Sequence, residues 1–167
     1  LDVSWLSLVA FAASYYQRSL GELALNSLPP SLKSLRQATL ERRLAALTPS
    51  SSPEAADAKT PLPTLTEEQA TVLQLMASSN KPCLLHGSTG SGKTEVYLRR
   101  AAEVLASDPH AQVLIMVPEI NLTPQLEARV RNRFEPMLGA GCVVSMHSGM
   151  TPAQRTGAWL AAHLGQA

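Results

Sequence analysis

The octapeptide Gly87–Thr94, GSTGSGKT, constrains this chain more than any other feature. It matches the phosphate-binding pattern G-x-x-x-x-G-K-[ST] at every position. Its glycines let the backbone bend around phosphates without a Cβ clash, and the successive N–H groups then form a concave anion site. An apolar run precedes the octapeptide and a helical pattern follows it, which is the context that such a loop needs. The sequence therefore predicts an NTP-binding protein.

Lys93 and Thr94, at the end of this loop, are predicted to be its catalytic residues. The Lys93 ammonium is expected to reach the β- and γ-phosphates, and the Thr94 hydroxyl is expected to ligate the Mg²⁺ that accompanies the nucleotide. The helix that follows adds its dipole and its free N–H groups to the same anion site. The predicted nucleotide-binding residues are Gln69, Gly87, Ser88, Thr89, Gly90, Ser91, Gly92, Lys93 and Thr94.

Gln69 lies 18 residues before Gly87 and permits two interpretations. It ends the capping box Thr66-Glu67-Glu68-Gln69, in which its side chain would bond back to the Thr66 N–H group. An amide side chain can also bind the edge of an adenine through two hydrogen bonds. The spacing alone does not distinguish the capping role from the adenine-binding role.

The part of the chain before this capping box divides into a helical segment and a linker. Apolar residues spaced three and four apart predict helices over residues 1–47, interrupted at Leu28-Pro29-Pro30. The second of these stretches, Leu32–Leu47, carries a basic face, which we interpret as solvated, with a nucleic-acid surface as the alternative. Residues 48–64 are rich in Pro, Ser, Ala and Thr, so they are predicted to be a linker.

From Leu65 to the end of the chain, helical patterns alternate with short apolar runs. Thr123 is a predicted N-cap with Pro124 at the first helical position, and Thr151 opens a second capping box. Alternating strands and helices favour a parallel sheet with right-handed crossovers. Residues 65–167 are therefore predicted to be the truncated first part of an α/β, RecA-like domain. Its strands are expected at residues 83–85, 113–117 and 142–146, and its first helices at residues 69–78 and 94–106.

Composition limits the remaining classes of function. The net charge of +1 excludes a polycation, so any nucleic-acid contact must come from a local patch. Two isolated cysteines, Cys83 and Cys142, make neither a zinc framework nor a disulfide scaffold. The apolar stretch Leu6–Tyr16 is too short to span a bilayer and lacks a basic flank, so a cytoplasmic location without a membrane is expected. Because the first residue is Leu1, we expect a fragment of a longer protein.

A carboxylate that would hold Mg²⁺ and orient water is hard to place. Glu119 follows an apolar run, but Pro118 intervenes, so a loop role is favoured over that of the acidic motif. No Asp or Glu follows Glu135, and this chain alone is therefore expected not to turn over ATP. His147, at the end of an apolar run, is interpreted as structural, with a loop facing DNA or a nucleotide as the alternative.

Three segments resemble the start of the helicase core of the PriA family, the bacterial primosomal replication-restart helicases of superfamily 2. They are HGSTGSGKTEVYLR, VLIMVPEINLTPQLEARVRNRF and HSGMTPAQRTGAWL, and the strong resemblance covers residues 65–167. Residues 5–32 also resemble the helical stretch that follows the N-terminal DNA-binding part of that family. Only residues 33–64 separate the two regions, which is too short for the winged-helix domain that the family usually has there.

The resemblance implies an ATP-dependent helicase that moves 3′ to 5′ on DNA in replication restart. It implies ATP and Mg²⁺ as cofactors, with Gln69 binding adenine, and it assigns Thr123, Pro124 and Gln125 to the backbone of single-stranded DNA. Arg129, Arg131 and Arg133, further along the same predicted helix, would extend its positive field, although solvated roles are expected for at least two of them.

The same resemblance implies partners for the protein, and two alternative functions stay open beside it. It implies single-stranded and forked DNA, primosome proteins and single-stranded-DNA-binding protein as partners. Zinc is expected in the complete protein, with its cysteine ligands, the acidic motif and the second motor domain beyond Ala167. The alternatives are another superfamily 2 motor, such as a RecG-like enzyme, and a P-loop ATP-binding module that is not a motor.

Overall fold

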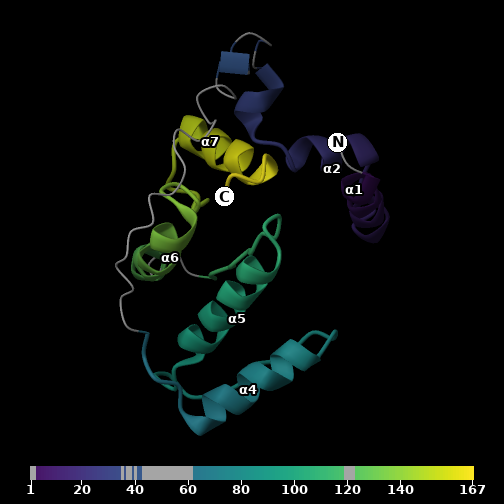
Figure 1. The fold of residues 1–167 in the computed structure, drawn as a ribbon. Coiled ribbons are helices and arrows are strands. Elements are labelled where there is room, and N and C mark those ends of the chain that lie inside the picture. Colours follow the sequence, from purple (N-terminus) through teal and green to yellow (C-terminus); the bar gives the residue numbers. More distant parts are fainter. Residues whose placement is uncertain (1–2, 35, 37–38, 40, 43–61, 119–122) are drawn as a thin grey trace. The chain divides into compact units, whose positions relative to one another are not determined.

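The computed structural model describes residues 3–34, 36, 39, 41–42, 62–118 and 123–167 (Figure 1). The chain divides into two compact units. One unit combines Leu1–Ser50 with Val144–Gln166, and the other combines Ser51–Val143 with Ala167. Among the described residues, no helix has both the length and the apolar character that a membrane span needs.

The first unit contains helices and no strand among its described residues. Helix α2 begins after Ser19, whose hydroxyl caps it by accepting from the Glu22 N–H group at 3.2 Å. The break predicted at Leu28-Pro29-Pro30 is confirmed, because α2 ends at Asn26 and a 3₁₀ turn starts at Pro30. Most of the second predicted helical stretch, Leu32–Leu47, lies outside the described residues. The elements of this unit are α1 (Val3–Tyr15), α2 (Leu20–Asn26), the 3₁₀ turn η1 (Pro30–Ser34) and α7 (Pro152–His163).

Helix α7 begins at the capping box that the sequence predicted. The Thr151 hydroxyl accepts from the Gln154 N–H group at 3.3 Å, and the Gln154 side chain accepts from the Thr151 N–H group at 2.9 Å. The helix packs against η1, where the hydroxyl of the fully buried Thr156 bonds to that of Ser31. Thr156 also donates to the Pro152 carbonyl at 2.8 Å, so its buried polar group is satisfied.

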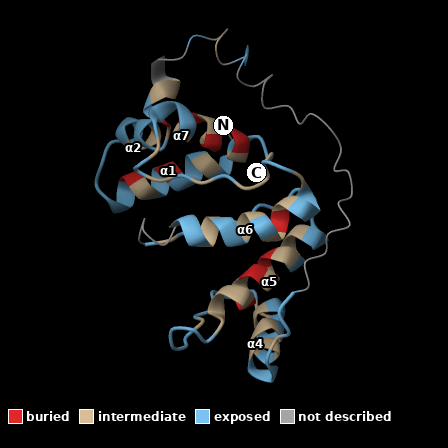
Figure 2. Ribbon diagram, turned by 90° about the vertical axis from the view of Figure 1, so that its left-hand side faces the viewer, coloured by how far each residue is buried: buried red, intermediate tan, exposed pale blue. Residues whose placement is uncertain are grey.

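The second unit contains helices α4 (Glu67–Ser78), α5 (Lys93–Ser107) and α6 (Thr123–Leu138). Leu98 and Ala101 of α5 and Phe134 of α6 form its buried core. Figure 2 shows buried segments of α5 and α6 in red. Burial of large apolar side chains provides the main favourable free energy of folding. The core of this unit thus fixes α5, which follows the phosphate-binding loop, against α6.

The parallel sheet predicted from the apolar runs is wrong, because no described residue lies in a strand. The side chains of Leu84 and Leu114 are 92% and 84% exposed. Ile115, Cys142 and Val143 instead pack against the helical core around Leu98 and Phe134. An apolar run favours burial of its side chains but does not provide the backbone partners that define a strand. Here one side of the run meets helices and the other side meets solvent.

Candidate nucleotide-binding site

Two glycines shape the phosphate-binding loop at the entry to α5. Gly90 has φ +84°, and Gly92, directly before the first helical residue, has φ +80° and ψ +18°. This left-handed region disfavours residues with a Cβ atom, so glycine is needed at both positions. Gly92 offers no side-chain oxygen to the first N–H groups of α5. The Glu95 N–H group donates to the Gly92 carbonyl at 2.9 Å, so the N–H groups at the very start of the helix and its positive end are what an anion would meet.

The Lys93 ammonium lies against the loop that precedes it. It donates hydrogen bonds to the carbonyl oxygens of Gly87 at 2.6 Å and Ser88 at 2.7 Å. The Ser91 N–H group also donates to the Ser88 carbonyl, at 3.3 Å, which closes a turn. The only fixed positive charge of the loop thus lies beside its own backbone, where phosphate oxygens would also meet it.

Gln69 connects the start of α4 to this loop. Its Oε1 accepts from the Thr66 N–H group at 3.0 Å, as a capping box requires, and the Thr66 hydroxyl accepts from the Gln69 N–H group. Its Nε2 donates to the Ser91 carbonyl at 3.1 Å. A Cβ atom added to Gly92 would overlap the same amide nitrogen. The predicted capping role is confirmed, and the amide also holds the loop.

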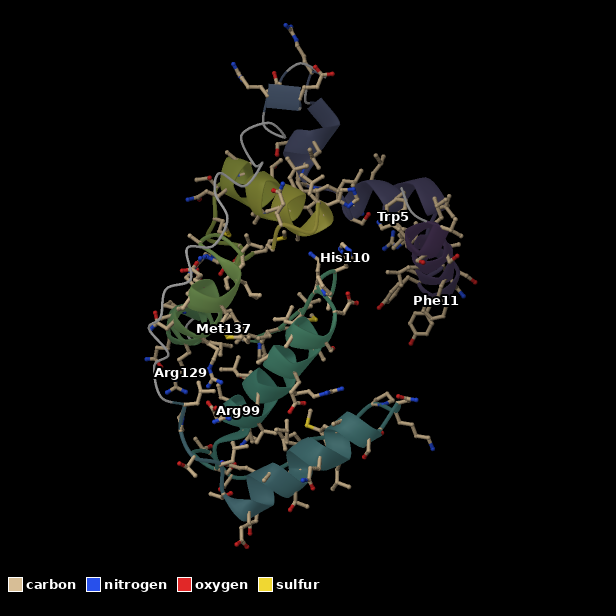
Figure 3. The ribbon with its side chains drawn as sticks, viewed as in Figure 1. Trp5, Phe11, Arg99, His110, Arg129 and Met137 are labelled. Carbon is tan, nitrogen blue, oxygen red and sulfur yellow. The ribbon has the colours of Figure 1, made fainter. Side chains whose placement is uncertain are left out.

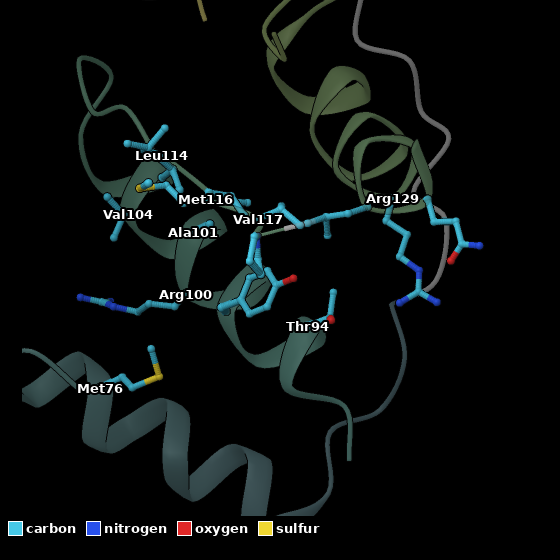
Figure 4. Close-up of a pocket in the computed structure, with 15 residues that line it drawn as sticks. Met76, Thr94, Arg100, Ala101, Val104, Leu114, Met116, Val117 and Arg129 are labelled. Atoms are coloured by element: carbon cyan, nitrogen blue, oxygen red, sulfur yellow. The ribbon is translucent and has the colours of Figure 1, made fainter. Parts of the chain in front are cut away.

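A pocket of about 660 Å³ lies beside the loop, in the same unit. Thr94 of α5 and Gln125 and Arg129 of α6 contribute to its wall, together with the run Val113–Pro118 (Figure 4). The lining is mostly apolar, and residues 87–92 are not part of it, so this pocket is not the phosphate cradle. It nevertheless brings Thr94 of the predicted nucleotide site and Gln125 of the predicted DNA site to one wall.

An ion-pair cluster lies one residue after Thr94. Glu95 Oε1 accepts from Arg99 Nε at 2.8 Å, and Glu95 Oε2 accepts from Arg133 Nη2 at 2.5 Å. Burial raises the pKa of Glu95, but the hydrogen bonds and positive charges of Arg133 and Arg99 outweigh it. The pKa of Glu95 therefore lies below its ordinary value, and the carboxylate is charged at neutral pH.

A sequence family described as DEAD/DEAH box helicase matches residues 66–163, which is more than half of the chain. The chain belongs to the DEAD/DEAH box helicase family. Membership implies the use of a nucleotide and Mg²⁺. The residues of the loop fit a nucleotide with Mg²⁺, because two glycines with positive φ, the lysine and the N-terminus of α5 lie together there.

Curated relatives of this chain carry the description "Replication restart protein PriA". The chain is 35% identical to the Rickettsia conorii protein over 147 residues, covering 87% of the chain and 20% of that protein. It is 41% identical to the Bacillus subtilis protein over 108 residues, covering 62% and 12%. It is 42% identical to the Haemophilus influenzae protein over 105 residues, covering 62% and 13%. The predicted resemblance to PriA is confirmed.

The chain spans about a fifth or less of the length of these relatives. No solved structure matches the chain.

The residues that the resemblance assigned to DNA lie at the start of α6. The helix begins at Thr123, whose side chain is outside the description, and Pro124 and Gln125 are exposed. Of the three arginines further along, Arg131 pairs with Glu127 and Glu135 of its own helix, and Arg133 pairs with Glu95. Arg129 is exposed and projects from α6 (Figure 3). Arg129 is therefore the arginine of the three placed to extend a positive field.

His147 and Glu119, two other residues considered from the sequence, add little to the description of this site. The Nδ1 atom of His147 is buried without a hydrogen-bond partner among the described residues, and the histidine lies in the first unit. Glu119 lies outside the described residues. The described part of the chain contains no group of three or more His, Cys, Asp or Glu side chains that would hold a metal ion.

The contact between Glu95 and Arg133 was not predicted from the sequence. Glu95 directly follows Lys93 and Thr94, and this position beside the loop is the signal that the sequence offers. No local pattern connects Glu95 to Arg133, which lies 38 positions further along the chain. Arg133 was placed in a basic series of three arginines, at least two of which were expected to be solvated, and its side chain is only 10% exposed.

Proposed function

We propose that this chain is the ATP-binding part of a DNA helicase that moves 3′ to 5′ in replication restart. The observation that carries the proposal is the loop Gly87–Thr94, bent at Gly90 and Gly92 and followed directly by α5. The family match and the similarity to proteins described as replication restart protein PriA support it.

Lys93 and Thr94 are the catalytic residues of this proposal. The Lys93 ammonium exchanges its contacts with the Gly87 and Ser88 carbonyls for phosphate oxygens, which it binds more strongly because they are charged. The Thr94 hydroxyl ligates Mg²⁺. The loop residues Gly87–Gly92 offer backbone N–H groups to the phosphates. The bound nucleotide supplies the phosphoanhydride bond whose cleavage releases free energy for translocation.

Gln69 has two connected roles in the proposal. Its bonds to the Thr66 N–H group and the Ser91 carbonyl fix the loop relative to α4. Each polar atom of the Gln69 amide retains one further hydrogen-bonding position, which is a hydrogen on Nε2 and a lone pair on Oε1. Those positions are the ones that an adenine edge would use, so capping and adenine binding are compatible in one side chain.

Thr123, Pro124 and Gln125 contact the backbone of single-stranded DNA in this proposal. They form the N-terminus of α6, where free N–H groups and the positive end of the helix favour phosphate. Arg129 adds charge beside them. In the complete protein we propose forked DNA, primosome proteins and single-stranded-DNA-binding protein as partners, and a zinc site outside this chain. The same proposal divides the chain into a helical segment (residues 1–47), a linker (48–64) and a motor domain (65–167). It also includes a cytoplasmic location.

Directional unwinding by the complete protein tests the function. Forked DNA with a single-stranded arm of either 3′ or 5′ polarity is unwound with ATP and Mg²⁺ present. We expect unwinding of the fork that offers a 3′-to-5′ track, with Lys93→Ala inactive and Lys81→Ala, an exposed lysine outside the loop, unaffected. ATPase activity that DNA does not stimulate, without unwinding of either fork, would favour a module that is not a motor and overturn the proposal.

A further inference from the structure

The carboxylate of Glu95 joins two helices through its two oxygens. Oε1 is bound by Arg99 of its own helix α5, and Oε2 is bound by Arg133 of α6. The side chains of Glu95 and Arg133 are only 17% and 10% exposed. Because little water reaches this pair, its geometry is held more firmly than that of a surface ion pair. Displacing Glu95 would leave the buried charge of Arg133 without this partner.

The other ion pairs of α5 and α6 do not connect the two helices. Arg131 binds Glu127 and Glu135 within α6, and Arg100 binds Glu103 within α5. Among the described side chains, Glu95–Arg133 is therefore the ion pair that joins α5 to α6. Among the described residues, Nη1 of Arg133 is buried without a hydrogen-bond partner, and the bond to Glu95 orients this guanidinium.

The two helices carry the two proposed binding sites at their N-termini. Glu95 lies in the first turn of α5, next to Thr94, so its position is tied to that of the loop. Arg133 is followed by Phe134, whose side chain packs in the core with Leu98 and Ala101 of α5. A packed helix moves as a rigid element, so a shift of α6 at Pro124 or Gln125 is transmitted to Arg133.

We propose that Glu95 and Arg133 are positioning residues that couple DNA binding at the start of α6 to nucleotide binding at Lys93 and Thr94. The inference rests on the proposed function, because it needs both ligands. Arg99 supports the coupling by holding the second oxygen of Glu95 while donating to the Pro63 carbonyl at 2.6 Å. One oxygen of the Glu95 carboxylate is thus held within α5 by Arg99, and the other is bound by Arg133 of α6.

Coupling between two sites has a property that a purely structural role lacks. If DNA changes nucleotide affinity by some factor, the nucleotide must change DNA affinity by the same factor. Loss of the Glu95–Arg133 pair should therefore reduce both factors equally. General destabilisation of the unit would instead weaken both affinities and leave their mutual dependence intact.

The experiment measures both factors in the complete protein. The probes are a non-hydrolysable ATP analogue with Mg²⁺ and a single-stranded oligothymidylate, each titrated with and without saturating amounts of the other. Glu95→Gln, Arg133→Gln, the double variant and Arg133→Lys are compared with wild type. Arg131→Gln is the matched control, because it removes an arginine two residues away whose partners lie within α6.

We expect a wild-type factor of about 5 or more in both directions, within the usual range of coupling between sites. It should fall towards 1 in Glu95→Gln and Arg133→Gln and fall no further in the double variant. Arg133→Lys, which keeps the charge but not the planar geometry, should retain part of the factor. Arg131→Gln should keep all of it.

Coupling factors as large as those of the wild type, measured in folded Glu95 and Arg133 variants, would overturn the proposed coupling. If Arg133→Gln does not fold, Arg133→Lys decides the matter, because an unchanged factor there contradicts a coupling that depends on the geometry of the guanidinium. A wild-type factor of 1 in a protein that unwinds DNA would overturn the coupling and leave the proposed function standing. Loss of unwinding by the wild type itself would instead remove the proposed function.

Discussion

Gln69 Nε2 donates a hydrogen bond to the Ser91 carbonyl oxygen at 3.1 Å, which ties the first turn of α4 to the phosphate-binding loop. The same side chain closes the capping box with Thr66. One amide therefore stabilises a helix end and a ligand-binding loop, and these two roles are separable by mutation.

Gln69→Ala is expected to weaken nucleotide binding, whereas Thr66→Ala is expected to leave it nearly unchanged. Both changes remove part of the capping box, which costs about 1 kcal/mol of stability. Only Gln69→Ala also frees the Ser91 carbonyl and the loop. The affinity for inorganic triphosphate should fall because the loop binds phosphates, and the affinity for ATP should fall further because the proposed adenine contact is lost as well. The measurement is calorimetric titration of both ligands alongside a thermal melt. A loss confined to ATP would show that Gln69 acts through adenine and not through the loop.

Lys93→Ala in the complete protein is expected to lower ATPase activity and unwinding by at least about 100-fold, as removal of a key charge-stabilising donor does. The reason is that Lys93 is the side-chain cation of the loop, held 2.6 Å and 2.7 Å from two of its carbonyl oxygens. DNA affinity should change little, because the proposed DNA contacts lie on α6. ATPase rates and DNA titrations check both expectations, with Lys81→Ala as the control. Hydrolysis near the wild-type rate would contradict the assignment of the loop.

Local interactions were predictable from this sequence to the level of single hydrogen bonds. The capping boxes at Thr66 and Thr151 form as expected, because both partners lie within four residues of each other. The loop leads into a helix at Lys93, one residue from the expected start. These features depend on side-chain chemistry and backbone geometry that neighbouring residues determine by themselves.

Pairing between distant segments was not predictable in the same way. The run Val113–Val117 alternates between inward and outward side chains as a strand would, with Ile115 against the core and Leu114 in solvent. The alternation says which face is buried, but not what lies beside the backbone, so the sheet was predicted wrongly. The Glu95–Arg133 contact was missed for the same reason, since its two residues are 38 positions apart.

The stability of the second unit is expected to depend on the ionisation of Glu95. Its pKa in the folded state lies below the ordinary 4.5, because the arginines outweigh burial. A depressed carboxyl pKa contributes stability that is present above the unfolded pKa and is lost as the pH falls through the folded pKa. The free energy of unfolding should therefore decrease as the pH is lowered below about 4.5.

Urea denaturation between about pH 3 and pH 7 measures this dependence. Glu95→Gln should show a shallower decrease in the free energy of unfolding across the acid range than wild type. Glu103→Gln is the matched control, since Glu103 lies on the same helix with a side chain 44% exposed and pairs with Arg100. Equal slopes for Glu95→Gln and wild type would contradict the assignment of this acid dependence to Glu95.

Thr123→Ala is expected to weaken binding of single-stranded DNA by roughly tenfold, the usual effect of losing a hydrogen bond to a charged group. Helix α6 begins at Thr123, so the first N–H groups of that helix and its positive end meet there. Because phosphates carry no base identity, the loss should be about equal for oligonucleotides of different sequence. Thr151→Ala in α7 is the control, as it removes a capping threonine in the other unit and should cost about 1 kcal/mol of stability while DNA affinity stays unchanged. Titrations with two oligonucleotides of different composition, alongside thermal melts of both variants, separate the roles. Lower melting of Thr123→Ala with wild-type DNA affinity would leave Thr123 as a helix cap alone and would move the DNA contact away from the start of α6.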